Sequence, residues 1–437
     1  MKLLICWAFT AGVALPLVAQ DTTRANEGVR VGITYTPGTR PGLVVVPGPG
    51  LDSVRAMIRR DLDFSDRFEV VVLPDGGGTA GPRTLAEGVN YGLFRSFGAS
   101  FALELLADAT GATVRLHDLV GTRILNQQTV VLPPPTDPAF RLAVHRLSDE
   151  VVRWVTGTPG IAETRVAFVS GGRIYRIDSD GYGLTPLTAE GQTSLSPAWS
   201  PDGTRIAYTR LGEGKGGVAV VTLATGATQL APGTQTALNI TPMWHPDGRT
   251  LIYAHSDENG TNIVTANVAD NCCVQRLTVG RFADNLSPTY SPDGRRVAFV
   301  STRAGPPQIY SMDADGTDQD LLVPFDFGAT GSSNAPEWSP DGASVIFHRE
   351  VSGSPQIFQM DVASRRVKQL TSSGRNEDPT WAPDGRHIAF VSDRSGRRQL
   401  WIIDTETSRV RQLIVPGAAR LPSWSRRLRA APAGPTP

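Results

Sequence analysis

Five aspartates recur in one short motif, and carboxylates gathered in this way could hold a metal ion or do acid–base chemistry. Each stands between a proline and a glycine; they are Asp202, Asp247, Asp293, Asp341 and Asp384. Pro-Asp-Gly also makes a tight turn, because proline presets φ, aspartate hydrogen-bonds to its own backbone and glycine tolerates positive φ. We therefore interpret these aspartates as turn residues rather than as a catalytic ring.

Six histidines are the other candidate metal ligands: His117, His145, His245, His255, His348 and His387. His245 and His387 fall in the tight turns, where any polar residue serves. His255 and His348 end strands at neighbouring positions and could approach a common opening. Turn and strand positions account for these residues without a metal, so we expect neither a metal nor a cofactor.

Two adjacent cysteines, Cys272 and Cys273, lie in the loop-like stretch ADNCCVQ. In an oxidising compartment they could form a vicinal disulfide, a contact between chains, or stay free. A free or incidental pair is favoured over a functional one. They have no Cys-x-x-Cys partner that would indicate a metal site, and the third cysteine, Cys6, falls in the apolar leader.

The usual catalytic signatures are not found in the sequence. It has no Gly-x-Ser-x-Gly, no His-Glu-x-x-His and no glycine-rich phosphate loop. Formal charge is balanced, with 42 basic and 42 acidic residues, so nothing global attracts nucleic acid or an anionic membrane. The missing signatures count against an enzyme.

An aromatic residue precedes each Pro-Asp-Gly motif by two positions, and these residues recur at a nearly constant interval. Trp199, Trp244, Tyr290, Trp338 and Trp381 are separated by 45, 46, 48 and 43 residues. This is the length of a four-stranded propeller blade. A further 43 residues leads to Trp424, in LPSWS, which lacks the turn motif.

The incomplete last repeat predicts how the propeller closes. Residues 164–188 contain three strands without a preceding aromatic motif, and residues 421–425 contain a first strand with nothing after it. Joining the two halves makes a sixth blade and removes open sheet edges. We predict an α/β N-terminal domain followed by an all-β six-bladed propeller that is closed by strands from both ends.

Four segments follow from these patterns: a signal peptide at 1–19, an N-terminal arm at 20–38, an α/β domain at 39–160 and the propeller at 161–430. Lys2, the apolar stretch after it and small Ala19 are typical of an export signal. No later segment is apolar and long enough to cross a bilayer. In the α/β domain, the spacing of Val54 to Leu62 predicts one helix, and Pro138 and Gly157 bound another.

Six short linkers lead into the innermost strands, and they should encircle one mouth of the propeller channel. They read TSLSP, LNITP, DNLSP, SNAP, NEDP and ARLP. Their side chains are mostly Asn, Ser, Thr and Asp, which suit hydrogen bonding to a partner, and binding residues commonly lie on loops over a rigid scaffold. Ordinary polar linkers remain the alternative for any one residue.

The order of signal peptide, α/β domain and six Trp-Ser-Pro-Asp-Gly blades resembles the TolB family, the periplasmic component of the Tol-Pal cell-envelope system. The most specific local match is HRLSDEVVRWVTGTPGIAETRVAFVS, residues 145–170. The resemblance implies a periplasmic scaffold that binds the peptidoglycan-associated lipoprotein (Pal) and TolA, with other outer-membrane proteins as further candidates. It also implies a role in outer-membrane constriction during cell division and in envelope integrity.

The resemblance places both partners on this sequence. The Pal-facing positions would be the residues before each inner-strand proline: Leu238, Asn239, Thr241, Asp284, Asn285, Leu286, Asn334, Asn376 and Asp378. The TolA-binding arm would contain Val29, Arg30, Val31, Ile33 and Tyr35. In the arm, apolar residues alternate with Arg30 and other residues, so it could add a strand to a partner sheet or form an edge strand of its own domain.

A rival hypothesis comes from a different class: a secreted propeller enzyme, such as a metal-dependent lyase or hydrolase that uses the central channel. A bound transition metal with turnover of an oligosaccharide would favour it. A stoichiometric protein complex without turnover would favour the scaffold.

Overall fold

The computed structural model describes residues 38–47, 49–73, 88–108, 111–212, 215–233, 237–280, 283–325 and 331–428. All of them belong to one compact unit that begins at Tyr35. The predicted signal peptide and almost all of the predicted arm lie outside these residues. No helix among those described combines the length and the apolar character that crossing a bilayer requires.

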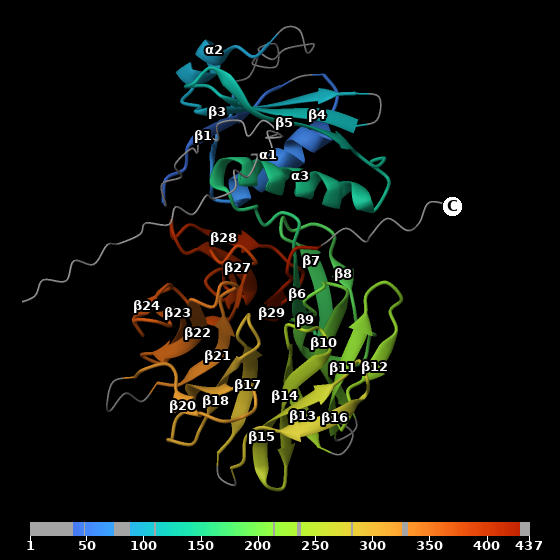
Figure 1. Cartoon of the computed structure of the whole chain (residues 1–437), viewed down its shortest axis with the longest axis vertical. Helices are drawn as coiled ribbons and strands as arrows, with labels where there is room; N and C mark the ends of the chain where they lie inside the picture. Colours follow the sequence, from blue (N-terminus) through green and yellow to red (C-terminus); the bar gives the residue numbers. More distant parts are fainter. Residues whose placement is uncertain are drawn as a thin grey trace, which may run out of the picture. The chain divides into compact units, whose positions relative to one another are not determined.

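The α/β domain is built on a five-stranded sheet in the order β2-β1-β3-β4-β5. The strands are β1 (Gly42–Val45), β2 (Glu69–Val70), β3 (Phe101–Ala107), β4 (Gly111–Asp118) and β5 (Arg123–Val131). The helices are α1 (Asp52–Phe64), α2 (Tyr91–Ser96) and α3 (Ala139–Thr156). β1 pairs in parallel with β2 and β3, and the other pairs are antiparallel. Helices α1 and α3 pack together on one side of this sheet (Figure 1).

The two predicted helices form where their patterns indicate. The buried residues of α1 include Val54, Met57, Ile58 and Leu62, the same stripe that the spacing predicts. Helix α3 follows Pro138 and ends at Gly157, whose φ of 78° is left-handed and whose N–H donates to the carbonyl of Arg153. A residue without Cβ tolerates that conformation, which explains why the helix stops there.

Two other elements of this domain are short. The apolar run at 67–74 forms only the two-residue strand β2, because its pairing with β1 covers only Gly42 and Leu43. The weak helical pattern at 84–97 contains the helix α2, capped by the Asn90 side chain, which accepts the Leu93 N–H at 3.0 Å. Residues 84–87 lie outside the described part.

Six four-stranded sheets follow and form the propeller (Figure 1). Blade 1 contains β9 (Thr193–Trp199), β10 (Arg205–Gly212), β11 (Lys215–Thr222) and β12 (Thr228–Leu230). Blade 2 contains β13 (Leu238–Trp244), β14 (Thr250–Asp257), β15 (Gly260–Asn267) and β16 (Cys272–Arg276). Blade 3 contains β17 (Asn285–Tyr290), β18 (Arg296–Ser301), β19 (Gln308–Asp313) and β20 (Asp320–Leu321).

The remaining blades complete the ring. Blade 4 contains β21 (Ser333–Trp338), β22 (Ser344–Val351), β23 (Ser354–Asp361) and β24 (Val367–Gln369). Blade 5 contains β25 (Asn376–Trp381), β26 (His387–Ser392), β27 (Gln399–Asp404) and β28 (Val410–Leu413). Blade 6 joins β29 (Arg420–Trp424) to β6 (Arg165–Ser170), β7 (Arg173–Asp178) and β8 (Thr185–Pro186).

The recurring aromatic residue packs each blade against its neighbour. Trp244 of blade 2 lies in one apolar cluster with Ala207 and Val218 of blade 1, and its indole N–H donates to the Ala198 carbonyl at 3.1 Å. Trp424 does the same at the closure, where it pairs with Val166 and packs against both blade 5 and blade 6. The predicted sixth blade, closed by strands from the two ends of the propeller, is confirmed.

One buried carboxylate holds the connection between α3 and the propeller. Asp149 accepts the backbone N–H groups of Ala162 at 2.7 Å and Glu163 at 2.9 Å. Burial outweighs these bonds and raises the pKa of Asp149 to about 7. This carboxylate lies inside the stretch 145–170 that carries the family resemblance.

Candidate functional site at the mouth of the propeller channel

Six non-glycine residues with a left-handed backbone surround one mouth of the channel. Each immediately precedes the proline of an innermost strand and has φ between 48° and 53°; they are Ser196, Thr241, Ser287, Ala335, Asp378 and Leu421. Together with the six prolines they line a cavity of about 110 Å³. The linkers singled out in the sequence therefore do encircle one mouth.

A β-bulge in every blade produces this ring. The pairing of first and second strands shifts register around the proline in all six blades. Proline has no N–H to give to the ladder, so it is tolerated at a bulge. A left-handed backbone costs an L-residue roughly 1–2 kcal/mol, and such conformations cluster at functional sites. Because this unfavourable backbone conformation recurs in all six blades, the mouth is a candidate functional site.

Hydrogen bonds between blades hold the ring. The N–H of Thr241 donates to Thr209 Oγ1 of blade 1 at 3.1 Å, and the N–H of Ser287 donates to Thr241 Oγ1 at 3.2 Å. On the other side, the N–H of Asp378 donates to His348 Nδ1 at 3.2 Å. Leu421 donates in turn to Asp378 Oδ2 at 3.3 Å. Four of the six left-handed residues therefore hydrogen-bond to the preceding blade.

His348 and Asp378 are both set toward their neutral forms. Burial is the main cause for each: it lowers the pKa of His348 and raises the pKa of Asp378, against their mutual attraction. A neutral imidazole can accept the Asp378 N–H, as the geometry requires. His348 therefore acts as a hydrogen-bond acceptor at the mouth, the end of the propeller that its strand position predicted.

Three of the nine proposed Pal-facing residues are buried asparagines. Asn239, Asn285 and Asn376 are at most 1 % exposed. The amide of Asn285 donates to the Thr261 carbonyl of blade 2 and its oxygen accepts from Arg303. Asn239 donates to the Gly216 carbonyl of blade 1, and Asn376 donates to Gln356 Oε1 of blade 4. These side chains hold the linkers in place from inside.

The other proposed residues can be reached from outside. Leu238 is 43 % exposed, Asp284 is exposed, and Leu286 and Asn334 are half-buried. Thr241 and Asp378 line the cavity itself. The rim thus consists of exposed linker residues over a layer of buried asparagines.

Stacked arginines support that layer. The Arg394 guanidinium lies 5.3 Å from the centre of the Phe390 ring and 5.0 Å from that of Trp401, and it donates to Asn376 Oδ1 at 2.8 Å. Arg303 repeats the arrangement in blade 3 with Phe299 and Tyr310. Each arginine thus connects the aromatic side chains of its blade to the linker asparagine.

We expect Arg394→Ala to lower the free energy of unfolding by about 2–3 kcal/mol, because two cation–π contacts and a charged hydrogen bond to a buried amide disappear. Chemical denaturation measures the change. Arg397→Ala, at an exposed position in the same loop, is the matched control and should stay within about 0.5 kcal/mol of the parent. Equal stability of the two variants would contradict the supporting role.

Below the mouth, Met243 and Glu337 separate the 110 Å³ cavity from a second, larger one of about 220 Å³, since both residues line each cavity. The larger cavity is surrounded by the recurring aromatic residues. Glu337 Oε1 accepts a hydrogen bond from the backbone N–H of Trp381 at 3.1 Å and another from the Thr380 hydroxyl at 3.2 Å. Burial dominates and raises the pKa of Glu337 to about 7.

Sequence reasoning missed a polar cluster that joins the α/β domain to blade 5. His387 is fully buried, with Nδ1 2.7 Å from Asp384 and Nε2 3.2 Å from Asp66. Arg409 contacts Asp66 at 2.8 Å, and Arg386 donates to the Asp66 carbonyl at 3.0 Å. The interpretation of His387 as a replaceable turn residue was wrong, because the turn is covered by the segment after α1. The sequence indicates the burial of His387 only through its position, because it is an ionisable residue at the start of an apolar strand.

Burial alone would lower the pKa of His387, but attraction and hydrogen bonding to Asp384 and Asp66 outweigh it and raise the pKa to about 9. The imidazole is therefore a cation at neutral pH. In the described residues, one group of possible metal ligands comes together: Asp61, His145 and Asp180. Arg141 donates to Asp180 at 2.5 Å, so a protein cation already neutralises that carboxylate, and the group functions as an ion-pair network.

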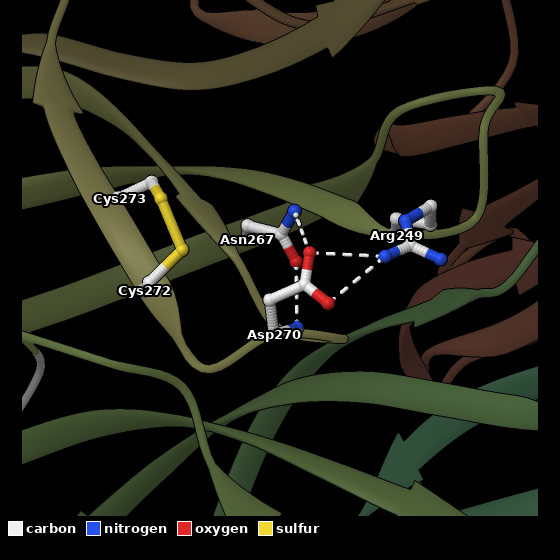
Figure 2. Close-up of a disulfide and its surroundings, with 5 residues drawn as sticks. All are labelled: Arg249, Asn267, Asp270, Cys272 and Cys273. Atoms are coloured by element: carbon white, nitrogen blue, oxygen red, sulfur yellow. Dashed lines mark hydrogen bonds and ion pairs between the residues drawn. A yellow bond between two sulfur atoms is a disulfide. The ribbon is translucent and has the colours of Figure 1, made fainter.

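Cys272 and Cys273 form a disulfide (Figure 2), which is one of the three alternatives that the sequence leaves open. Cys273 has a left-handed φ of 65° and lies where the pairing of β15 and β16 is irregular. This local bulge brings the two sulfur atoms together. The proposed arm residues Val29, Arg30, Val31, Ile33 and Tyr35 lie outside the described part of the chain.

The fold and the mouth define a class: a six-bladed propeller after a small α/β domain, with a rigid polar rim around one end of its channel. A family model described as the TolB beta propeller domain matches residues 152–428. The Tol-Pal system protein TolB of Bordetella parapertussis is 31 % identical over 304 residues, 67 % of each chain. The TolB homolog of Chlorobium chlorochromatii is 30 % identical over 319 residues, 69 % of this chain and 68 % of its own. The chain therefore belongs to the TolB family.

Other relatives give the extent of the similarity. The TolB homolog of Chlorobium luteolum is 31 % identical, and the match spans 60 % of each chain. The crystal structure of TolB from Acinetobacter baumannii superimposes with a TM-score of 0.77 at 23 % identity, covering 90 % of this chain and 98 % of that one. This structure supports the predicted fold. The Bordetella parapertussis relative is named as a Tol-Pal system protein.

Proposed function

We propose that the protein is a periplasmic scaffold of the Tol-Pal system that binds the globular domain of Pal over the channel mouth. The observation that carries the proposal is the ring of six left-handed residues, which places exposed linkers on a rigid base. Loops fixed in advance lose little conformational entropy when a partner binds. The name of a relative indicates the Tol-Pal system, and the ring supports the channel mouth as the binding surface.

Titration calorimetry of the protein with the soluble domain of its own organism's Pal tests this proposal. We expect saturable one-to-one binding, and we expect Leu238→Asp to weaken it at least tenfold by placing a charge at the rim. Ile414→Asp, at an exposed residue just after β28, is the matched control and should bind like the parent. Absence of heat and of co-elution at high concentration would reject the proposal.

We further propose that the arm around Val29 to Tyr35 binds TolA by adding a strand to it. Apolar Val29, Val31 and Ile33 alternate with Arg30, so one face of an extended segment would be apolar. We expect a variant that lacks residues 27–35 to lose binding to TolA and to keep binding to Pal. Retention of TolA binding would move that site elsewhere on the chain.

A further inference from the structure

We propose that Cys272–Cys273 is a site of reversible thiol–disulfide exchange, with a dithiol as its reductant, and that the exchange sets the pairing of the outermost strand of blade 2. The bond lies at the start of β16 (Figure 2). Cys273 is exposed, and exposed disulfides are the labile ones. The inference does not depend on the proposed binding of Pal or TolA.

The bulge at the disulfide is particular to this blade. Thr265 pairs with Gln275, but Asn267 pairs with Cys272, so Cys273 and Val274 together stand opposite Ala266. In the other five blades, the described pairing of third and fourth strands has no such shift. Cys273 also carries a left-handed backbone that an L-residue disfavours. The pairing is irregular at the place where the bond constrains it.

The turn before the disulfide is held independently. Asp270 accepts two bonds from Arg249 at 2.9 Å and exchanges two with Asn267 (Figure 2). The N–H of Val268 donates to the Arg249 carbonyl at 2.9 Å. Strand β15 is largely buried, whereas β16 is largely exposed. When the bond breaks, β16 is therefore the side that rearranges.

The two pairs on either side of the bulge, Thr265 with Gln275 and Asn267 with Cys272, differ in register by one residue. Once the bond no longer holds Cys273 in its left-handed conformation, the two pairs compete, and β16 frays from β15. In the bulged form, the Val274 side chain lies beside Gly233, which follows the last strand of blade 1. A Cβ atom added to Gly233 would lie 2.9 Å from Val274 Cγ2. As β16 frays, Val274 moves away from Gly233. Reduction therefore loosens the outer seam between blades 1 and 2.

The chemistry is a two-electron exchange. A thiolate of the dithiol attacks one sulfur atom of the pair, the Cys272–Cys273 bond breaks, and a mixed disulfide forms. The second thiol of the reductant then displaces the remaining protein thiolate. The reductant leaves as a disulfide, and its two protons end on Cys272 and Cys273. The global fold should persist, because closing so small a ring constrains the unfolded chain little.

The test treats the folded protein with dithiothreitol, maps the free thiols by alkylation and peptide mass spectrometry, and follows amide hydrogen exchange. Mapping separates this pair from Cys6. We expect the untreated protein to contain the disulfide, and the dithiol to open it while the protein stays folded. Exchange should then rise at least tenfold in residues 273–276 and 231–233 and stay unchanged in β15.

The double variant Cys272→Ser/Cys273→Ser should show the same fast exchange with or without dithiol, and reoxidation of the parent should restore slow exchange. Free thiols in the untreated protein, or a bond that resists dithiol in the folded state, would overturn the proposal. Reduction with unchanged exchange would overturn it as well. None of these outcomes depends on Pal binding, so the two proposals fail separately.

Discussion

His387→Ala is expected to lower the free energy of unfolding by about 3–5 kcal/mol, which is the cost of leaving buried charges without their partner. The cation lies between Asp384 and Asp66 with no exposure to solvent, so its loss leaves two carboxylates facing each other. At an unfolding entropy of roughly 2.1 cal/mol/K per residue, this corresponds in a chain of this length to a fall in the melting temperature of roughly 3–6 °C. Thermal unfolding at pH 6.5 measures the effect.

The same residue predicts how stability depends on pH. The folded pKa of about 9 is above the ordinary value for histidine, about 6.5. The protonated form is therefore favoured by folding, and its contribution is complete below pH 6.5 and is lost as the pH rises through 9. The other facing groups, Arg386 and Arg409, stay charged over this range. The stability gap between the parent and His387→Ala should shrink between pH 6.5 and 9.

Two control variants separate charge from packing. His387→Gln keeps a hydrogen-bonding side chain that does not titrate. The difference in free energy of unfolding between this variant and the parent should therefore be smaller, and it should shrink over the same pH range. His245→Ala removes a histidine from the turn of blade 2, where the side chain is 28 % exposed, contacts Asp247 at 3.1 Å and packs edge-on against Tyr290. We expect that variant to cost about 1 kcal/mol or less. An effect as large as that of His387→Ala would show that turn geometry, not the buried cation, matters.

Asp378→Val is expected to have the largest effect on the mouth. Valine disfavours the left-handed backbone that Asp378 adopts at φ 52°, and the Leu421 N–H loses its acceptor. Together these changes should lower the free energy of unfolding by about 2–4 kcal/mol. On the proposed function, Pal affinity should fall at least a hundredfold, because the base beneath the rim changes shape.

Asp378→Asn is the matched control. Asparagine tolerates the left-handed region, and its side-chain oxygen can accept the Leu421 N–H. We expect it to lie within about 1 kcal/mol of the parent and within tenfold in Pal affinity. Calorimetry with both variants gives the comparison. If Asp378→Asn fails as completely as Asp378→Val, the carboxylate itself is needed, and if both bind normally, Pal does not use this mouth.

The sequence predicted the large architecture because that architecture repeats. One aromatic residue and one Pro-Asp-Gly turn per blade gave both the period and the closing blade, and Pro138 with Gly157 bounded α3. These signals are local, so a single sequence contains them. The segment boundaries and the Pal and TolA residues stay predictions, and for the arm the structure adds nothing.

What the sequence did not predict depends on contacts between distant segments. His387, the first residue of β26, is covered by Asp66, over three hundred residues away in the chain. The linker asparagines looked like surface residues because their partners, such as Arg394 and the carbonyl groups of the preceding blade, are specified elsewhere. The left-handed ring has no composition signal either, since Ser, Thr, Ala, Asp and Leu all occupy it.

The closing blade has a consequence for the order in which the chain can fold. Its halves are joined across 260 residues, from Arg165 to Ser425, so β6 emerges from the ribosome with its inner edge unpaired while five further blades are made. Contacts of such long range slow folding and leave strand edges open to wrong pairing in the meantime. A chain that stops short of Trp424 would keep that edge unpaired, and the edge could then accept β29 from a full-length copy.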